Sequence, residues 1–225
     1  MAYLSTKHNF FFIHIYKNAG TSVKNALAKL EPNGLKPKSL KWRVRRKVER
    51  TLGGVFVPRK RGMDRLIQLN TLKFGHLVFQ DIEDNINVDQ LKFFAICRNP
   101  WDWQVSLYRF VRGFEDHFQH NMTTEMSFDE YIHWRCHQDA RLQKNFLVDF
   151  RLRVRDIFVL RFENLHEDWG RLSTHLGVEL PPLPHTNRSN AKNEAYKDYY
   201  TPETRALVEE TFAEDIEYFN YSFDG

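Results

Sequence analysis

The sequence predicts an α/β domain with three layers, in which a central, mainly parallel sheet is flanked by helices. Three apolar runs indicate the strands, at residues 10–15, 91–97 and 156–161. They are rich in aromatic and β-branched residues, which is typical of strands buried on both faces. Segments with helical spacing lie between them, and strands that alternate with helices favour this architecture.

The composition supports one globular domain over residues 1–225. Hydrophobic residues make up 42% of the chain and aromatic residues 15%, which excludes a disordered protein. A chain of 225 residues is long enough to bury a full core. The formal net charge of +4 fits an anionic ligand, but it does not decide among a nucleotide, an acidic glycan and nucleic acid.

The cysteines and the apolar runs bear on the compartment. Cys97 and Cys136 are the only cysteines, so no disulfide framework is expected and a reducing compartment is the simpler assumption. No apolar run approaches the roughly 20 residues of a membrane span. Residues 10–15 are also too short for the core of a signal peptide. A cytoplasmic protein is expected, with a trimmed luminal domain as the alternative.

The first apolar run is followed by a short loop and then by a helix pattern. The loop residues are Lys17, Asn18, Ala19, Gly20, Thr21 and Ser22. Apolar residues at helical spacing follow over residues 23–30, and Thr21 or Ser22 can cap that helix. Free N–H groups and the dipole at a helix start favour a phosphate, and Lys17 adds a positive charge. The sequence therefore predicts a P-loop-like phosphate site, although the lysine precedes the glycine, unlike in a Walker A loop.

Two features follow this first helix. A dense basic segment occupies residues 36–65. It is either a solvated face or a surface for an acidic acceptor, membrane headgroups or nucleic acid, and no nucleic-acid-binding motif accompanies it. Residues 73–79 form an apolar segment that Gly75 interrupts, so His76 is expected at a strand end or in a loop.

The second strand, residues 91–97, is followed directly by Arg98, Asn99 and Pro100. Pro100 suits the first turn of a helix, which is expected over residues 101–113. Ser106 lies about two turns into that helix. An arginine fork and a hydroxyl can converge on one anion, so Arg98 and Ser106 predict a second phosphate site.

The remaining elements follow from caps and breakers. Ser127 and Glu130 have the spacing of a capping box. The expected elements are two helices over residues 127–150, a strand over 156–161, a turn over 162–165, a helix over 169–176 that ends at Gly177, and a last helix that begins at Thr201-Pro202-Glu203.

Four of these residues are expected to share one cleft. Lys17, His76, Arg98 and Glu163 each come directly after an apolar run, and ligands of open α/β sheets bind at the carboxyl ends of the strands. A metal site is not expected. The neighbouring histidines lack an H-E-x-x-H signature, and no C-x-x-C pair occurs; these histidines are His117, His120, His133 and His137.

The two phosphate-binding patterns resemble those of sulfotransferases. K-x-x-G-T-S after an apolar strand resembles their 5′-phosphosulfate loop. The segment from Arg98 through Ser106 to Tyr108 resembles their 3′-phosphate segment, R-[ND]-P-x-x-R-x-x-S-x-Y, with Trp103 in place of the second arginine. Residues 158–165, 199–203 and 214–223 resemble family 2 sulfotransferases, a group that contains glycan O-sulfotransferases. The resemblance thus spans nearly the whole chain.

The resemblance implies an enzyme that transfers a sulfonyl group from 3′-phosphoadenosine 5′-phosphosulfate (PAPS) to an acceptor hydroxyl, foremost on a carbohydrate, without a metal. It implies that residues 17–22, Arg98 and Ser106 bind the nucleotide. The partners expected are this donor and a hydroxylated acceptor, either sugar-like or anionic; no nucleic acid is expected.

In-line displacement at sulfur requires a base for the acceptor proton and a cation at the leaving oxygen. Lys17 meets the second requirement. His76 is the candidate base because an imidazole titrates near neutral pH, and His14 and Glu163 are its rivals.

Two other classes of protein stay open. A P-loop-like kinase would use the same phosphate cradle, but its Walker-type lysine and magnesium-binding carboxylates are not in place. A non-catalytic module that binds acidic glycan or nucleic acid would depend on residues 36–65.

Overall fold

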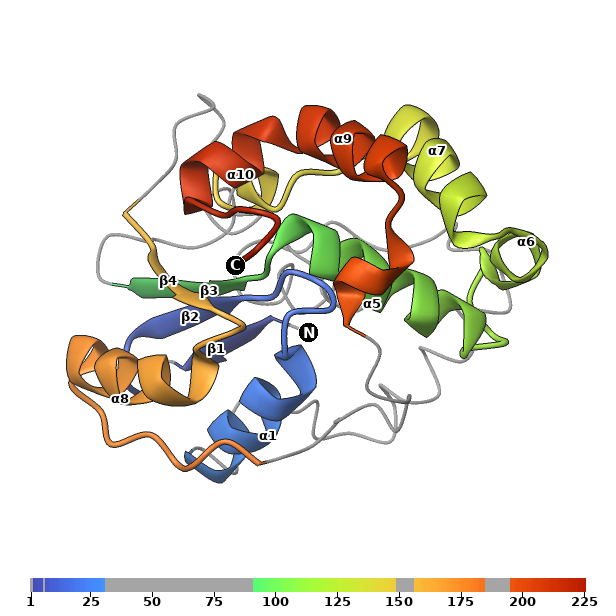
Figure 1. Cartoon of the computed structure of the whole chain (residues 1–225). Coiled ribbons are helices and arrows are strands. Elements are labelled where there is room, and N and C mark those ends of the chain that lie inside the picture. The colour runs from blue at the N-terminus through green and yellow to red at the C-terminus, as the bar shows by residue number, and fades with distance from the viewer. Residues whose placement is uncertain (1, 6, 31–90, 149–155, 185–194) are drawn as a thin grey trace.

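The computed structural model describes residues 2–5, 7–30, 91–148, 156–184 and 195–225, and a four-stranded sheet lies at the centre of this part of the chain (Figure 1). The strands are β1 (Tyr3–Ser5), β2 (Phe10–Ile13), β3 (Lys92–Cys97) and β4 (Phe158–Arg161), in that order across the sheet. β1 is antiparallel to β2, whereas β2, β3 and β4 are parallel. The predicted, mainly parallel sheet is confirmed, and the carboxyl ends of β2, β3 and β4 meet at one edge.

Helices and two 3₁₀ turns surround the sheet. The helices are α1 (Gly20–Leu30), α5 (Pro100–Arg112), α6 (His120–Glu125), α7 (Phe128–Gln138), α8 (Leu165–Leu176), α9 (Pro202–Thr211) and α10 (Ala213–Phe219); the turns are η1 (Lys144–Phe146) and η2 (Tyr196–Tyr199). None of the helices in the described ranges is long and apolar enough to cross a membrane.

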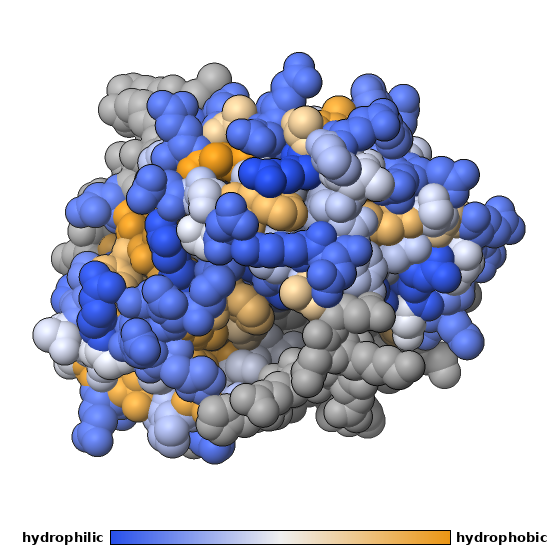
Figure 2. Space-filling view, viewed as in Figure 1, coloured by the Kyte–Doolittle hydropathy of each residue, from blue (hydrophilic) through white to orange (hydrophobic). Residues whose placement is uncertain are grey.

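The sheet carries a separate hydrophobic core on each face, which confirms the three layers. Phe10 and Phe12 of β2 point to the face covered by α1 and α8, and Phe11 and Ile13 point to the face covered by α5, α7, α9 and α10 (Figure 1). All four residues of β2 are buried, as expected of a strand between two helical layers. Figure 2 shows a mostly hydrophilic exterior on the viewed side, with hydrophobic residues in small patches.

Ring contacts fix the register of the parallel strands. Phe12 of β2 is the partner of Phe94 in β3, and their rings stack with centroids 4.9 Å apart. Cys97, the last residue of β3, is the partner of Arg161, the last residue of β4. The segments that follow these two strands therefore leave the sheet at the same level.

Two helix ends agree with the signals in the sequence. The Ser127 hydroxyl accepts the Glu130 N–H at 3.3 Å, and the Glu130 carboxylate accepts the Ser127 N–H at 2.8 Å, which is the predicted capping box. Gly177 ends α8 with φ +70°, a left-handed conformation that glycine adopts without strain.

Other boundaries differ from the prediction. The first parallel strand ends at Ile13, two residues early, because the chain already turns toward the loop. α8 begins at Leu165, four residues before the predicted start, with Glu167 and Asp168 in its first turn, where the helix dipole favours negative charge. The described part of residues 127–150 holds one α-helix and the short η1, not two helices, and β1 was not predicted.

Candidate functional site

The loop after β2 contains two residues other than glycine in the left-handed conformation. Lys17 has φ 64° and Ala19 has φ 53°. Such conformations cost of the order of 1–3 kcal/mol each and persist only where the surroundings impose them. Asn18, fully buried between them, donates from Nδ2 to the Ile96 carbonyl and to Gln143 Oε1, both at 2.7 Å. The loop thus takes its shape from β3 and from the segment after α7.

The start of α1 explains the single glycine of the loop. A Cβ on Gly20 would lie 1.8 Å from Nε2 of His14, so the close approach of the His14 ring requires a glycine there. The N–H of Val23 donates to the Ala19 carbonyl at 3.1 Å and makes the first helical bond. The N–H groups of Gly20 and Thr21 come before it, at the positive end of the helix, and can bind an anion.

Arg98 stands directly after β3 and connects two parts of this edge. Its Nη1 donates to the Lys17 carbonyl at 3.0 Å, and its Nε donates to Asp102 Oδ2 at 2.7 Å. The guanidinium carbon lies 4.1 Å from the centroid of the Phe162 ring, which comes after β4. A guanidinium has five N–H donors, so these contacts orient it and leave donors for an anion.

Lys17 and Arg98 place two positive charges in a partly buried region. Burial, and secondly the nearby Arg98 charge, lower the pKa of Lys17 to about 8. The Lys17 ammonium lies 4.2 Å from the centroid of the Phe110 ring on α5. A bound anion would relieve the repulsion between the two cations, so the electrostatics of this edge favour a phosphate or a sulfate.

Ser106 lies on the same side of α5 as the partner of Arg98. Asp102, which binds Arg98, precedes Ser106 by four residues, and residues at this spacing are neighbours on one face of a helix. The Ser106 side chain is partly exposed. Ser106 and Asp102, the partner of Arg98, therefore lie on one face of α5.

The two rival bases that the structure describes have different surroundings. Glu163 accepts the Asn99 N–H through Oε1 at 2.7 Å and the Tyr221 hydroxyl through Oε2 at 2.9 Å. Both carboxylate oxygens thus hold neighbouring backbone and side chain, which favours a structural role. His14 packs against Gly20 and lies 5.8 Å from the Phe12 ring. His76 and the basic segment 36–65 lie outside the described residues.

Trp103 has a structural role where the sulfotransferase pattern has a second arginine. It is completely buried, and its Nε1 donates to the carbonyl of Tyr16 at 2.7 Å. Its ring centroid is 4.7 Å from that of Tyr16. Trp103 therefore holds the residue directly before Lys17, and the missing arginine is replaced by a packing contact.

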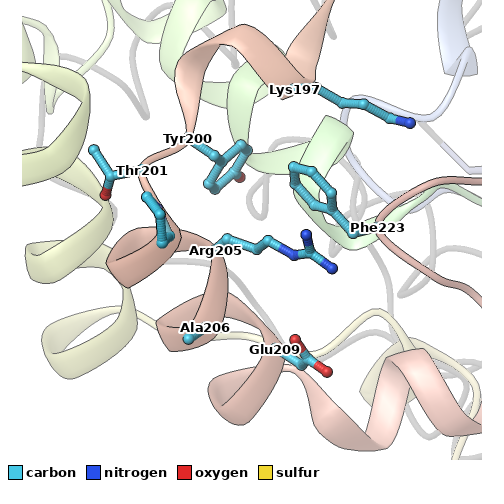
Figure 3. Close-up of a pocket in the computed structure, with 8 residues that line it drawn as sticks. Lys197, Tyr200, Thr201, Arg205, Ala206, Glu209 and Phe223 are labelled. Atoms are coloured by element: carbon cyan, nitrogen blue, oxygen red, sulfur yellow. The ribbon is translucent and has the colours of Figure 1, made fainter.

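A shallow hollow of about 380 Å³ lies between η2, α9 and the C-terminal segment (Figure 3). Its lining contains Lys197, Arg205 and Phe223, and the guanidinium carbon of Arg205 is 4.2 Å from the centroid of the Phe223 ring. Lys197 forms an ion pair with Asp224 at 2.9 Å. None of the predicted site residues lines this hollow. In the described ranges, no group of three His, Cys, Asp or Glu side chains could hold a metal ion.

The fold is that of an α/β domain, and this edge of its sheet gathers groups that can bind a phosphate. Backbone N–H groups at a helix start, a lysine and an arginine converge where the parallel strands end, which is where such sheets bind nucleotides. The residues brought together are Lys17, Gly20, Thr21 and Arg98, and Ser106 lies on the adjacent helix.

Comparison with known proteins gives the family. The model of the Sulfotransferase family matches residues 2–222, nearly the whole chain, and the protein belongs to this family. The resemblance found in the two phosphate-binding patterns is thereby confirmed. Among solved structures, the crystal structure of mouse sulfotransferase SULT7A1 complexed with PAP is 16% identical with a TM-score of 0.35; the match covers 63% of this chain and 64% of that chain. No curated protein matches.

The burial of Trp103 leads to a test of its structural role. Trp103→Arg, which restores the arginine of the pattern, is expected to lower the free energy of unfolding by about 3–5 kcal/mol, the range for loss of a large buried side chain. The substitution also buries an unpaired charge and removes the bond to the Tyr16 carbonyl. Urea denaturation measures the change. Trp134→Arg, at a half-buried position on α7, is the matched control; equal effects of the two substitutions would contradict this role.

Proposed function

We propose that the protein is a sulfotransferase that moves a sulfonyl group from PAPS to an acceptor hydroxyl. The observation that carries the proposal is the 3.0 Å bond from Arg98 Nη1 to the Lys17 carbonyl, which unites two anion-binding segments in a chain of the sulfotransferase family. We assign the 5′-phosphosulfate to residues 17–22 and the 3′-phosphate to Arg98 and Ser106. We propose that residues 1–225 form one sulfotransferase domain, which contains both segments.

The residues of this edge fit a nucleotide with two separated anionic groups. Gly20 and Thr21 offer backbone N–H groups at a helix start, and Arg98 offers a planar fork for a phosphate. When bound, PAPS supplies an activated sulfonyl group. Lys17 holds a positive charge beside the leaving phosphate oxygen and stabilises the charge that develops there.

We propose that His76 removes the proton of the acceptor hydroxyl. The assignment depends on the sequence, in which His76 follows Gly75 at the point where that glycine interrupts the apolar segment of residues 73–79. The two contacts of Glu163 support His76 over that rival, because both carboxylate oxygens already accept hydrogen bonds from neighbouring groups.

We propose a carbohydrate as the acceptor, and an aromatic surface beside Lys17 supports this class. Phe110, Phe114 and Phe118 have exposed fractions of 39%, 44% and 82%, which is unusual for phenylalanine. The rings of Phe110 and Phe114 lie 5.5 Å apart, and the Lys17 ammonium lies over Phe110 at 4.2 Å. Exposed aromatic rings next to a reaction centre can stack on the apolar face of a sugar ring. An anionic sugar would also contact residues 36–65.

Nucleotide choice tests the proposed function most directly. Adenosine 3′,5′-bisphosphate should bind more tightly than ATP in isothermal titration calorimetry, because only the bisphosphate occupies both anion sites. Arg98→Ala should lower the affinity for the bisphosphate about 10- to 150-fold, the equivalent of 1.5–3 kcal/mol for hydrogen bonds to a charged group. Arg171→Ala, which removes an exposed arginine of α8, is the control. Equal or tighter binding of ATP by the wild-type protein would exclude a sulfotransferase.

The pH dependence of kcat/KM should be bell-shaped. Lys17 acts as a cation, so activity should fall as the pH rises through about 8, the pKa of Lys17 in the free protein. His76 acts as a base, so activity should fall as the pH drops below about 6.5, the ordinary pKa of histidine. Lys17→Arg should move the alkaline limb to higher pH because a guanidinium keeps its proton there.

His76→Ala should remove the acidic limb and lower kcat roughly 10²–10⁴-fold, the usual contribution of a general base. Its affinity for adenosine 3′,5′-bisphosphate should stay unchanged, and its melting temperature shows that it is folded. A kcat near that of the wild type would transfer the role of base to His14 or Glu163.

Substitution of Phe110 tests the acceptor class. Phe110→Ala should raise KM for a sugar acceptor about 5- to 10-fold, the equivalent of roughly 1–1.5 kcal/mol for one aromatic contact. The KM for PAPS should change less, and Phe110→Tyr should restore the wild-type value because it keeps the ring. A screen of hydroxylated acceptors with labelled donor identifies the acceptor to use. Unchanged acceptor KM in Phe110→Ala would remove this surface from the acceptor site.

A further inference from the structure

Gln143, between α7 and η1, joins the two anion-binding segments through one buried side chain. It is completely buried. Its Oε1 accepts Asn18 Nδ2 at 2.7 Å and the Arg98 N–H at 3.0 Å, and its Nε2 donates to the Arg98 carbonyl at 2.7 Å. One amide therefore contacts both the loop after β2 and the residue that ends β3.

The orientation of this amide follows from its partners. A backbone N–H can only donate and a backbone carbonyl can only accept, so the two bonds to Arg98 assign Oε1 and Nε2 of Gln143. Asn18 is oriented in the same way, because its Nδ2 donates both to Gln143 and to the Ile96 carbonyl. An apolar or a negatively charged side chain of the same size could not make this set of bonds.

The backbone of this segment is held from the opposite side. The carboxylate of Asp215 on α10 accepts the N–H of Gln143 at 2.7 Å and that of Lys144 at 2.8 Å. Asp215 is itself completely buried. Gln143 is thus fixed at its backbone by α10 and at its side chain by both anion-binding segments.

We propose that Gln143 is a positioning residue that sets the separation between the 5′ and 3′ anion sites, and so determines the preference for nucleotides that carry both groups. The proposal rests on the proposed function. Gln143 is too deeply buried to touch the nucleotide, and it acts through Asn18 and Arg98. A nucleotide with one phosphate engages one site and needs no fixed separation, whereas a bisphosphate needs both sites at the correct spacing.

Two variants of Gln143 test this proposal by calorimetry with adenosine 3′,5′-bisphosphate and adenosine 5′-monophosphate. The quantity measured is the ratio of their dissociation constants. Gln143→Met should reduce the advantage of the bisphosphate at least tenfold while the affinity for the monophosphate changes less than threefold. A residue needed only for stability would lower the melting temperature and leave the ratio unchanged. Thr204→Val, which removes a buried hydroxyl on α9, is the matched control for lost stability.

Gln143→Glu adds a signature that loss of stability alone would not produce. A protonated carboxyl can donate to the Arg98 carbonyl and accept from the Arg98 N–H, as the amide does, whereas a carboxylate would repel that carbonyl. The bisphosphate advantage in this variant should therefore be small at pH 8 and recover at pH 5. The wild-type protein is measured at both pH values, because burial raises the pKa of neighbouring Asp215 to about 6.

The outcomes separate the two proposals. A wild-type protein without preference for the bisphosphate would overturn the proposed function and the role of Gln143 together. If the wild-type protein prefers the bisphosphate and both variants keep this preference at both pH values, the role of Gln143 alone is overturned. If Gln143→Met does not fold, the pH dependence of Gln143→Glu decides.

Discussion

The left-handed loop at residues 17–19 is the constraint on which the site depends. Its two unfavourable conformations bring the Lys17 carbonyl to Arg98 and the Asn18 side chain to β3. Among the described residues, several groups that hold the loop come from distant parts of the chain, including Trp103, which binds the Tyr16 carbonyl. The parallel pairing of β2 and β3 places these groups within reach. The strained conformation is therefore a consequence of tertiary structure, and the site exists only in the folded sheet.

The same geometry buries the Lys17 ammonium near Arg98, which has an electrostatic cost in the ligand-free protein. Lys17 has a pKa of about 8 in the folded protein and 10.5 in a free chain, so between these values the unfolded state binds more protons. The stability of the ligand-free protein should therefore rise with pH through this window, because a charge that is disfavoured first by burial and then by the nearby Arg98 is lost. At neutral pH this cost is present in full. An anion that binds only the folded state would stabilise it by mass action. Its negative charge would also offset the repulsion between Lys17 and Arg98.

The sequence was sufficient where function depends on local patterns, and insufficient where it depends on distant contacts. The strand and the helix on either side of residues 14–19 could be predicted because a strand, a turn and a helix start are encoded in consecutive residues; the binding roles of residues 17–22 and Arg98 stay a prediction. β1 is three residues long, too short for a pattern, and is a strand only because it pairs with β2. Gln143 has no local motif, since its partners are 125 and 45 residues away. The reason for tryptophan at position 103 likewise became visible only through its contact with Tyr16.

The C-terminal segment belongs to the same scaffold, although no predicted site residue lies in it. Asn99, directly after Arg98, donates from its side chain to the Ser222 carbonyl at 2.8 Å, and its N–H is held by Glu163. Glu163 also accepts the Tyr221 hydroxyl, so the ends of β3 and β4 and the C-terminal segment share one set of hydrogen bonds. The family match extends to residue 222, which includes this contact. The region that matches the family therefore contains the edge with Lys17 and Arg98 together with the segment that fixes the start of α5, and Ser106 depends on that helix for its position.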